Sequence, residues 1–374
     1  MTDPNDGLRM TEFLNAAVEL LTIQSTADRP DDLQRAVDFV VDFVGPGFHV
    51  ERFASHGKPS ALLYCGDRRP TFRVLLNGHV DVVPASPEQF RPYTDDGRLY
   101  ARGAQDMKIT ALAQAHVFRQ TAAELPFPLG LQVVADEEIG GRDGTGHQVE
   151  NGVDAEFALF GESSGLDIVA DSKGLVQAKL SARGRSAHGA YPWLGDNALL
   201  QIMDTVARLR AVYPMPDQAE WRTTVNVARV STSNQAANKV PDDAEAWLDI
   251  RFPAQDRDLG GRSSAEIADY LQSLCEPGVT AEVLARGAPH HVDHDHPDVR
   301  ALGEAARSAG YGGRFIYKHG SCDARYLAAK GVAAVAFGIG GDGQHGPDEY
   351  AEISTIEPYC QALEGFLALG AANI

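Results

Sequence analysis

Near-continuous apolar runs that alternate with helical patterns constrain the fold of this chain more than any other feature. Residues 72–83 read FRVLLNGHVDVV, and residues 128–138 and 155–162 form two further apolar runs that end in acids. Helical periodicity covers residues 31–45, and an Ala-rich helical pattern covers residues 107–125. Strands buried on both faces belong to parallel sheets, whose crossover connections place helices on the faces. We therefore predict an α/β fold with a mostly parallel sheet flanked by helices.

The character of the sequence changes near residue 174 and changes back near residue 287. Between these points, strands that alternate polar and apolar residues accompany two helical patterns, which is typical of an antiparallel α+β layer. We predict a discontinuous α/β domain of residues 1–173 and 287–374, interrupted by an inserted α+β domain of residues 174–286.

Composition excludes several classes of function. The chain has 374 residues, a formal net charge of −19 and a pI near 5.0. Nucleic acids and anionic membranes select clustered Lys and Arg, so neither is an expected partner. The N-terminus does not resemble a signal peptide, and no apolar run approaches the ~20 residues of a membrane span. The four cysteines lie far apart without a CxxC pair, so we expect a soluble, cytoplasmic protein with reduced thiols.

Histidine and acidic residues gather in five short segments at predicted strand ends or Gly-rich loops. Carboxylate and imidazole groups without thiolate suit zinc, manganese or cobalt in a hydrolytic site. Taken singly, each segment also has an ordinary explanation as a core histidine, a solvated acidic loop, a helix N-cap or a turn. The segments are GHVDVV (His79, Asp81), ARGAQDMK (Asp106), ADEEIGG (Asp136, Glu137, Glu138), FGESS (Glu162) and DGQHGPDE (His345, Asp348, Glu349).

The order of these segments resembles that of a zinc-dependent deacylase and exopeptidase family. This family includes acetylornithine deacetylase, succinyl-diaminopimelate desuccinylase, aminoacylase and bacterial glutamate carboxypeptidase. The resemblance covers essentially the whole chain and rests on HxD, GxxDMK, DEExG, GE, SAHGAYP, NKVP followed by DIR, and a late His before PDE. It implies a two-metal amidohydrolase fold whose inserted domain serves as a lid and dimerisation domain.

The resemblance implies that five side chains bind two divalent metal ions. Zinc is the foremost candidate, with cobalt and manganese as alternatives. Asp106 would bridge the two ions. His79 with Glu162 would complete one position, and Glu138 with His345 would complete the other.

Two further acids would act beside the ligands. Alternation along a strand puts His79 and Asp81 on one side, so Asp81 could hold the second ring nitrogen of His79 and orient it for a metal. Glu137 resembles the family's general base, which takes a proton from the attacking water and passes it to the leaving amine. A non-catalytic binder of amino-acid conjugates would lack a ligand or the base, and this sequence lacks neither.

The inserted domain contributes three residues by the same resemblance. His188 would reach across a homodimer to stabilise the tetrahedral oxyanion. Asn238 and Arg251 would contact the substrate, with Arg251 clamping a carboxylate. From the residues alone, Asn238 is equally well explained as a turn residue and Arg251 as a surface charge.

The expected reaction is hydrolysis of the amide bond of an N-acyl amino acid. The endings GSCDARYL and FGIGGDGQHGPDEY are closer to the acetylornithine and succinyl-diaminopimelate deacylases than to the carboxypeptidases. A dipeptidase or carboxypeptidase on the same site is the alternative. The histidine-rich segment from His290 to His296 could hold a further metal, but its position favours a solvated loop before the next helix.

Overall fold

Residues 9–372 are described in a computed structural model and belong to two compact units. Unit 1 lies within Met1–Asp171, His291–Tyr317 and Cys322–Ile374. Unit 2 comprises Ser172–His290 and Lys318–Ser321. Each unit has its own hydrophobic core, so each is described by itself.

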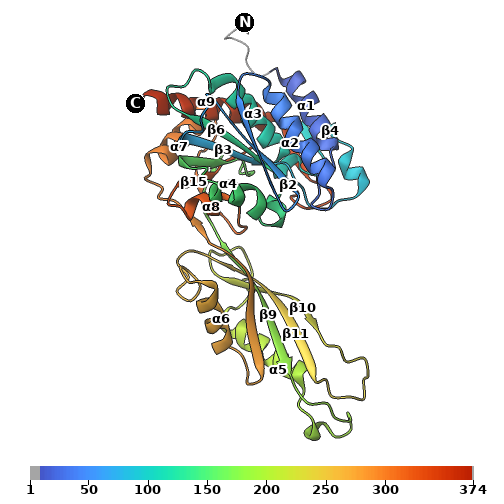
Figure 1. Cartoon of the computed structure of the whole chain (residues 1–374). Coiled ribbons are helices and arrows are strands. Elements are labelled where there is room, and N and C mark those ends of the chain that lie inside the picture. The colour runs from blue at the N-terminus through green and yellow to red at the C-terminus, as the bar shows by residue number, and fades with distance from the viewer. Residues whose placement is uncertain (1–8, 373–374) are drawn as a thin grey trace. The chain divides into compact units, whose positions relative to one another are not determined.

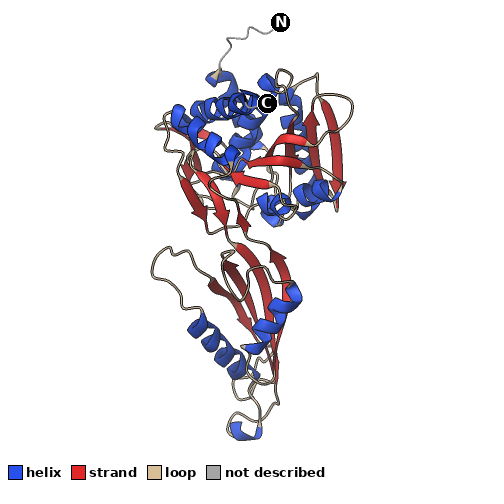
Figure 2. Ribbon diagram, turned by 90° about the vertical axis from the view of Figure 1, so that its left-hand side faces the viewer, coloured by secondary structure: helices blue, strands red, loops and turns tan. Residues whose placement is uncertain are grey.

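A nine-stranded, largely parallel sheet forms the centre of unit 1 (Figure 2). Strand β3 runs parallel to β6 and β7, and β15 runs parallel to β7, whereas β1 and β2 form an antiparallel hairpin at one edge. This arrangement confirms the predicted fold class. In sheet order the strands are β1 (His49–Ser55), β2 (Lys58–Tyr64), β6 (Leu129–Val134), β3 (Phe72–His79), β7 (Ala155–Phe160), β15 (Ala333–Ala336), β8 (Ile168–Ser172) and β13 (His290–His291), with β14 (Phe315–Lys318) beside β8.

Helices cover both faces of this sheet, as Figure 1 shows. Five helices form the layers on one face of the sheet: α1 (Met10–Thr22), α2 (Pro30–Val44), α3 (Ile109–Thr121), α7 (Pro297–Ser308) and α9 (Ile356–Ala372). The short helices α4 (His147–Glu150) and α8 (Ala324–Ala328) lie on the other face. A small antiparallel sheet contains β4 (Tyr93–Asp95), β5 (Arg98–Tyr100), β16 (Gly341–Asp342) and β17 (Tyr350–Glu352). No helix within residues 9–372 combines the length and the apolar character needed to cross a bilayer.

The close approach of α3 to β3 explains the Ala-rich sequence of this helix. A Cβ atom on Gly78 would lie 2.7 Å from the Cβ of Ala111, so both positions need small residues. Buried residues occur around the whole of α3, as expected for a helix enclosed between the sheet and outer helices. This packing fixes the end of β3, where His79 lies.

Unit 2 is a four-stranded antiparallel sheet with two helices. Its strands, in the order β10 (Thr224–Ser231), β11 (Asp243–Phe252), β9 (Gly174–Arg183) and β12 (Val279–Gly287), bury alternate residues along β9 and β11. Helices α5 (Ala198–Val212) and α6 (Ser264–Ser273) contribute to the core of this unit. Asn197 caps α5, and Ser263 with Glu266 forms a capping box at the start of α6.

Candidate metal centre

The acidic and histidine segments meet at the carboxyl ends of the parallel strands of unit 1. His79 is the last residue of β3. Glu137 and Glu138 follow the end of β6, and Glu162 follows the end of β7. Because β6, β3 and β7 are neighbours, their carboxyl ends place these side chains side by side, where α/β proteins commonly form their sites.

The side chains form two groups of possible metal ligands. Within each group, the ligand atoms lie within 4.8 Å of one another. The inner group contains His79, Glu137 and Glu162. In this group His79 and Glu162 are buried, and Nε2 of His79 lies 3.8 Å from Oε1 of Glu162.

The outer group contains Asp106, Glu138 and His345. Nε2 of His345 lies 3.0 Å from Oε2 of Glu138 and 3.1 Å from Oδ2 of Asp106. The other oxygen of Asp106, Oδ1, lies 3.0 Å from Nε2 of His79 in the inner group. Asp106 thus turns one carboxylate oxygen toward each group.

The electrostatics of the two groups fit the binding of cations. Burial, followed by the negative charge of Glu162, raises the pKa of Glu137 well above its usual value. Hydrogen bonds to Asp106 and Glu138 raise the pKa of His345 to about 10. Oε1 of Glu138 is buried and has no hydrogen-bond partner among the described residues. Crowded carboxylates with an unsatisfied buried oxygen are stabilised by a bound metal ion, and this oxygen and nitrogen donor set suits zinc, manganese or cobalt.

Asp81 holds the turn that carries Glu137 and Glu138. Its Oδ1 accepts the backbone N–H of Glu137 at 3.2 Å, and its Oδ2 accepts the backbone N–H of Glu138 at 3.0 Å. Nδ1 of His79 lies 3.1 Å from the backbone carbonyl oxygen of Asp81 and 3.5 Å from its carboxylate. Asp81 therefore bonds to residues of both the inner and the outer group.

Sequence reasoning missed the contribution of Arg102 and gave Glu349 no role. The buried carboxylate of Glu349 accepts the backbone N–H groups of Gln105 and Asp106, each at 3.1 Å, and pairs with Arg102. Arg102 also donates to the backbone carbonyl of Gly346 at 3.1 Å. This ion pair joins the turn that carries Asp106 to the loop that carries His345.

The model of Peptidase family M20/M25/M40 matches residues 75–369 of the chain. The chain belongs to this family. The family and the two ligand groups together make it a metal-dependent hydrolase of amide or peptide bonds.

Members of the M20/M25/M40 family with similar sequences include two succinyl-diaminopimelate desuccinylases. The protein of Acidiphilium cryptum (strain JF-5) is 29% identical over 362 residues, with 91% of this chain and 93% of the relative covered. The protein of Corynebacterium glutamicum is 30% identical over 338 residues, with 86% and 87% covered. The crystal structure of a tripeptidase from Staphylococcus aureus subsp. aureus Mu50 shares the fold, with a TM-score of 0.81, 18% identity, and 98% of this chain and 100% of the tripeptidase chain covered.

In this M20/M25/M40 chain, the three candidate substrate residues lie in unit 2 and do not converge. Gly189, next to the exposed His188, donates its backbone N–H to the carbonyl of Asn238 at 2.6 Å, so His188 and Asn238 are neighbours beyond the start of β11. Arg251 lies near the opposite end of β11, eight residues after Asp243. In an extended strand this spacing puts the two residues roughly 26 Å apart. Its guanidinium is bonded by Nε and Nη2 to the carboxylate of Asp249 at 2.7 and 3.0 Å.

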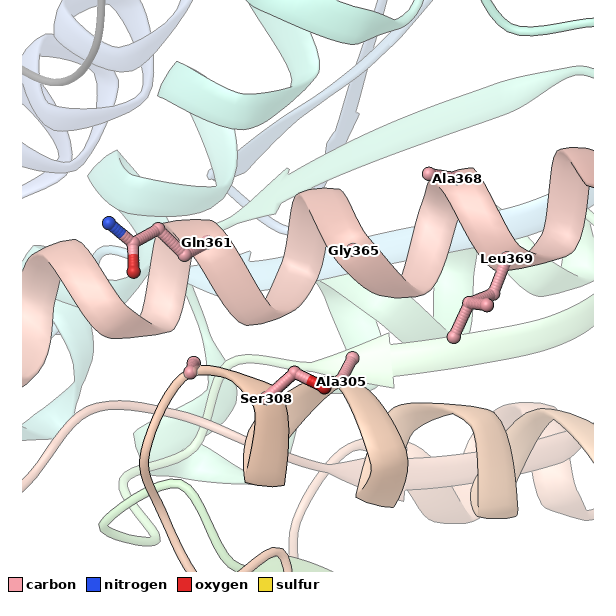
Figure 3. A pocket seen from close by; sticks show the side chains of 7 residues that line it. Ala305, Ser308, Gln361, Gly365, Ala368 and Leu369 are labelled. Atoms are coloured by element: carbon pink, nitrogen blue, oxygen red, sulfur yellow. The ribbon is translucent and has the colours of Figure 1, made fainter.

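Two other features, a histidine-rich segment and a surface pocket, offer no comparable chemistry. Among the described residues, the His290–His296 segment forms no group of three ligand atoms; His291 and His294 bond to Asp171, and His296 caps α7. A surface pocket of about 410 Å³ lies between α7 and α9 (Figure 3). Its lining contains no titratable side chain and consists of Ala305, Ser308, Ala309, Gln361, Gly365, Ala368 and Leu369.

Proposed function

We propose that this chain hydrolyses the amide bond of an N-acyl amino acid and that its two ligand groups each hold a divalent metal ion, zinc foremost. The observation that carries the two-ion proposal is Asp106, which turns one oxygen to each group. The deacylase activity is supported by desuccinylases at 29% and 30% identity over most of the chain. Unit 1 would be the catalytic domain and unit 2 the lid and dimerisation domain.

The proposed chemistry divides between the ions and Glu137. When bound, two divalent ions supply Lewis-acid activation of water and of the scissile carbonyl. Glu137 would accept a proton from the attacking water and deliver it to the leaving nitrogen. Burial, followed by the charge of Glu162, raises the pKa of Glu137, which makes its carboxylate a stronger proton acceptor. Asp81 would position Glu137 through the backbone N–H of that residue.

We place His188 in the active site of the partner subunit of a homodimer, as the oxyanion-stabilising residue. Because His188 and Asn238 lie together and Arg251 lies at the other end of β11, one site would use Arg251 of its own chain with His188 and Asn238 of the partner. Arg251 would exchange its bond with Asp249 for the substrate carboxylate. Exposed apolar residues of unit 2, including Trp193 (72% exposed), Leu200 and Met203, support a dimer interface there.

Subunit mixing tests the homodimer. His188→Ala should lower kcat by about 10²–10³-fold, with normal metal content. Mixing it with Glu137→Gln should restore about one quarter of the wild-type rate, because half of the randomly paired dimers are mixed and each holds one intact site. No restoration would count against the shared site. The double variant Leu200→Glu with Met203→Glu should sediment as a monomer.

A substrate panel tests the proposed reaction. Metal-reconstituted protein would be assayed with N-acetyl and N-succinyl amino acids, dipeptides and tripeptides, in the presence of zinc, cobalt or manganese. We expect turnover of an N-acyl amino acid at a kcat/KM at least tenfold above any peptide. Faster cleavage of peptides would favour the alternative, a dipeptidase or carboxypeptidase, which the fold of the staphylococcal tripeptidase also accommodates. No turnover of any compound would refute both activities.

We also propose that the enzyme works in the cytoplasm. The four cysteines form no disulfide within residues 9–372, and Cys322 and Cys360 are buried, which suits a reducing compartment. Elemental analysis of the protein purified from its own cells would identify the ion, and fractionation of those cells would identify the compartment.

A further inference from the structure

Lys173 is a fully buried lysine whose ammonium group lacks a hydrogen-bond acceptor. It has no exposed surface, and its Nζ has no hydrogen-bond partner among the described residues. Lys108 is equally buried, yet its Nζ donates to the carbonyls of Leu20 at 3.3 Å and Ile23 at 2.7 Å. A buried charge without a partner is strongly destabilising, so a position like that of Lys173 indicates a missing anion.

The surroundings of Lys173 within unit 2 are aromatic and cationic. Its Nζ lies 5.7 Å from the ring centroid of Trp221, and the ring of His319 lies 5.8 Å from that of Trp221. Burial and the positive charge of Arg222 lower the pKa of Lys173, with no carboxylate of the described chain opposing them. The acid Glu220 pairs with Nε of Arg222 at 3.2 Å, so it serves Arg222 rather than Lys173.

Trp221, Arg222 and His319 lie outside the helices and strands of unit 2. Trp221 and Arg222 belong to the connection between α5 and β10, which has no helix or strand, and both are half-buried. His319 lies on the short segment Lys318–Ser321, and the carbonyl of Lys318 accepts the backbone N–H of Lys173 at 3.2 Å.

We propose that Lys173, with Trp221, Arg222 and His319 around it, is a binding site for a small carboxylate anion. An ammonium beside a guanidinium matches the two oxygens of a carboxylate, and the flat indole and imidazole rings provide walls for a planar group. The carboxylate could be carried by a substrate or be a free small acid. The proposal concerns binding and stands whether or not the proposed deacylase reaction is found.

Thermal unfolding of the purified protein tests the site. Sodium succinate and sodium acetate would be compared with sodium chloride at equal ionic strength. We expect the carboxylates to raise the Tm of the wild type by about 2–4 °C, because a ligand of the folded state stabilises it. Lys173→Met should be at least as stable as the wild type in chloride and should lose this response, whereas Lys173→Arg should keep it. Lys330→Met, which removes an exposed lysine of unit 1, should respond like the wild type.

Three results would overturn the proposal. They are a wild type without a carboxylate-specific rise, a Lys173→Met variant that responds like the wild type, and a Lys173→Met variant that is less stable than the wild type in chloride. The last would mean that Lys173 stabilises the fold by itself. Fluorescence of Trp221 in a Trp193→Phe, Trp247→Phe background gives an independent readout of binding, and it should change with succinate and not with chloride.

Kinetics then separate the two sources of the carboxylate. N-succinyl and N-acetyl derivatives of one amino acid differ in the carboxylate of the acyl group. If the site binds this group, Lys173→Met should lower kcat/KM at least tenfold for the succinyl compound and less than twofold for the acetyl compound. If the site binds a free acid, both compounds should change equally while the carboxylate-dependent rise in Tm is lost.

Discussion

The inner and outer ligand groups use the same kinds of side chain but differ in how the fold holds them. The inner group contains two buried residues at strand ends, His79 and Glu162. The outer group depends on His345, which is exposed and has a left-handed backbone with φ of 61° on a loop. A sheet positions side chains more rigidly than a loop. From this difference we expect the proposed binuclear centre to join a tighter position to a looser one through the shared carboxylate of Asp106.

The largest effect should come from a matched pair of substitutions at adjacent residues. Glu137→Gln should reduce kcat by up to about 10⁴-fold, because it removes the proposed proton acceptor, while both metal ions stay bound. Glu138→Gln removes a ligand from the outer group and should lose one ion per chain. Metal content by elemental analysis and kcat on the best panel substrate separate the two variants. Loss of metal from Glu137→Gln would make Glu137 a ligand rather than the base.

A smaller effect on both groups is expected from Asp81→Asn. The amide nitrogen of Asn would face a backbone N–H of Glu137 or Glu138, so one of the two bonds would be lost. We expect metal affinity to fall about 10–100-fold at both positions, as for other residues that orient ligands. Competition with a chromophoric chelator measures it. Asp295→Asn, an exposed substitution in unit 1, serves as the control, and an effect confined to one group would contradict the shared role of Asp81.

The smallest effect, on the outer group alone, is expected from Glu349→Gln. Gln can still accept a backbone N–H bond but leaves the buried charge of Arg102 without its partner. The loop of His345 should loosen, so the affinity of the outer group for its ion should fall about tenfold. The affinity of the inner group should not change. Titration calorimetry with zinc gives both affinities. An equal loss at both positions would show that the ion pair supports the whole centre and not the outer group.

The sequence predicted the elements whose pattern is local and strong. Parallel strands such as β3 are continuous apolar runs, and α3 is periodic, so both were found. The hairpin of β1 and β2 was missed because β1 is a half-exposed edge strand and its turn, at His56 and Gly57, lacks the usual Asn-Gly signal, although both residues have positive φ. Short strands such as β8 and β14 depend on tertiary pairing and carry too little local pattern.

The candidate site was predictable as a set of ligand types, but its supporting contacts were not. The order of His79, Asp106, Glu138, Glu162 and His345 indicated a shared site, and the structure brings these residues together. The contacts made by Glu349 and the clamp from Asp81 to the following turn join segments far apart in the chain. No local pattern encodes them, and the same holds for the unpartnered ammonium of Lys173.

The most direct test of the unequal binuclear centre is a zinc titration of the metal-free protein by calorimetry, with His79→Ala and His345→Ala as matched variants. We expect two ions per wild-type chain, with affinities at least tenfold apart. His345→Ala should keep the tighter ion and lose the weaker one, and His79→Ala should lose the tighter one. A single ion per wild-type chain, two equal affinities, or loss of the tighter ion in His345→Ala would contradict the unequal binuclear centre.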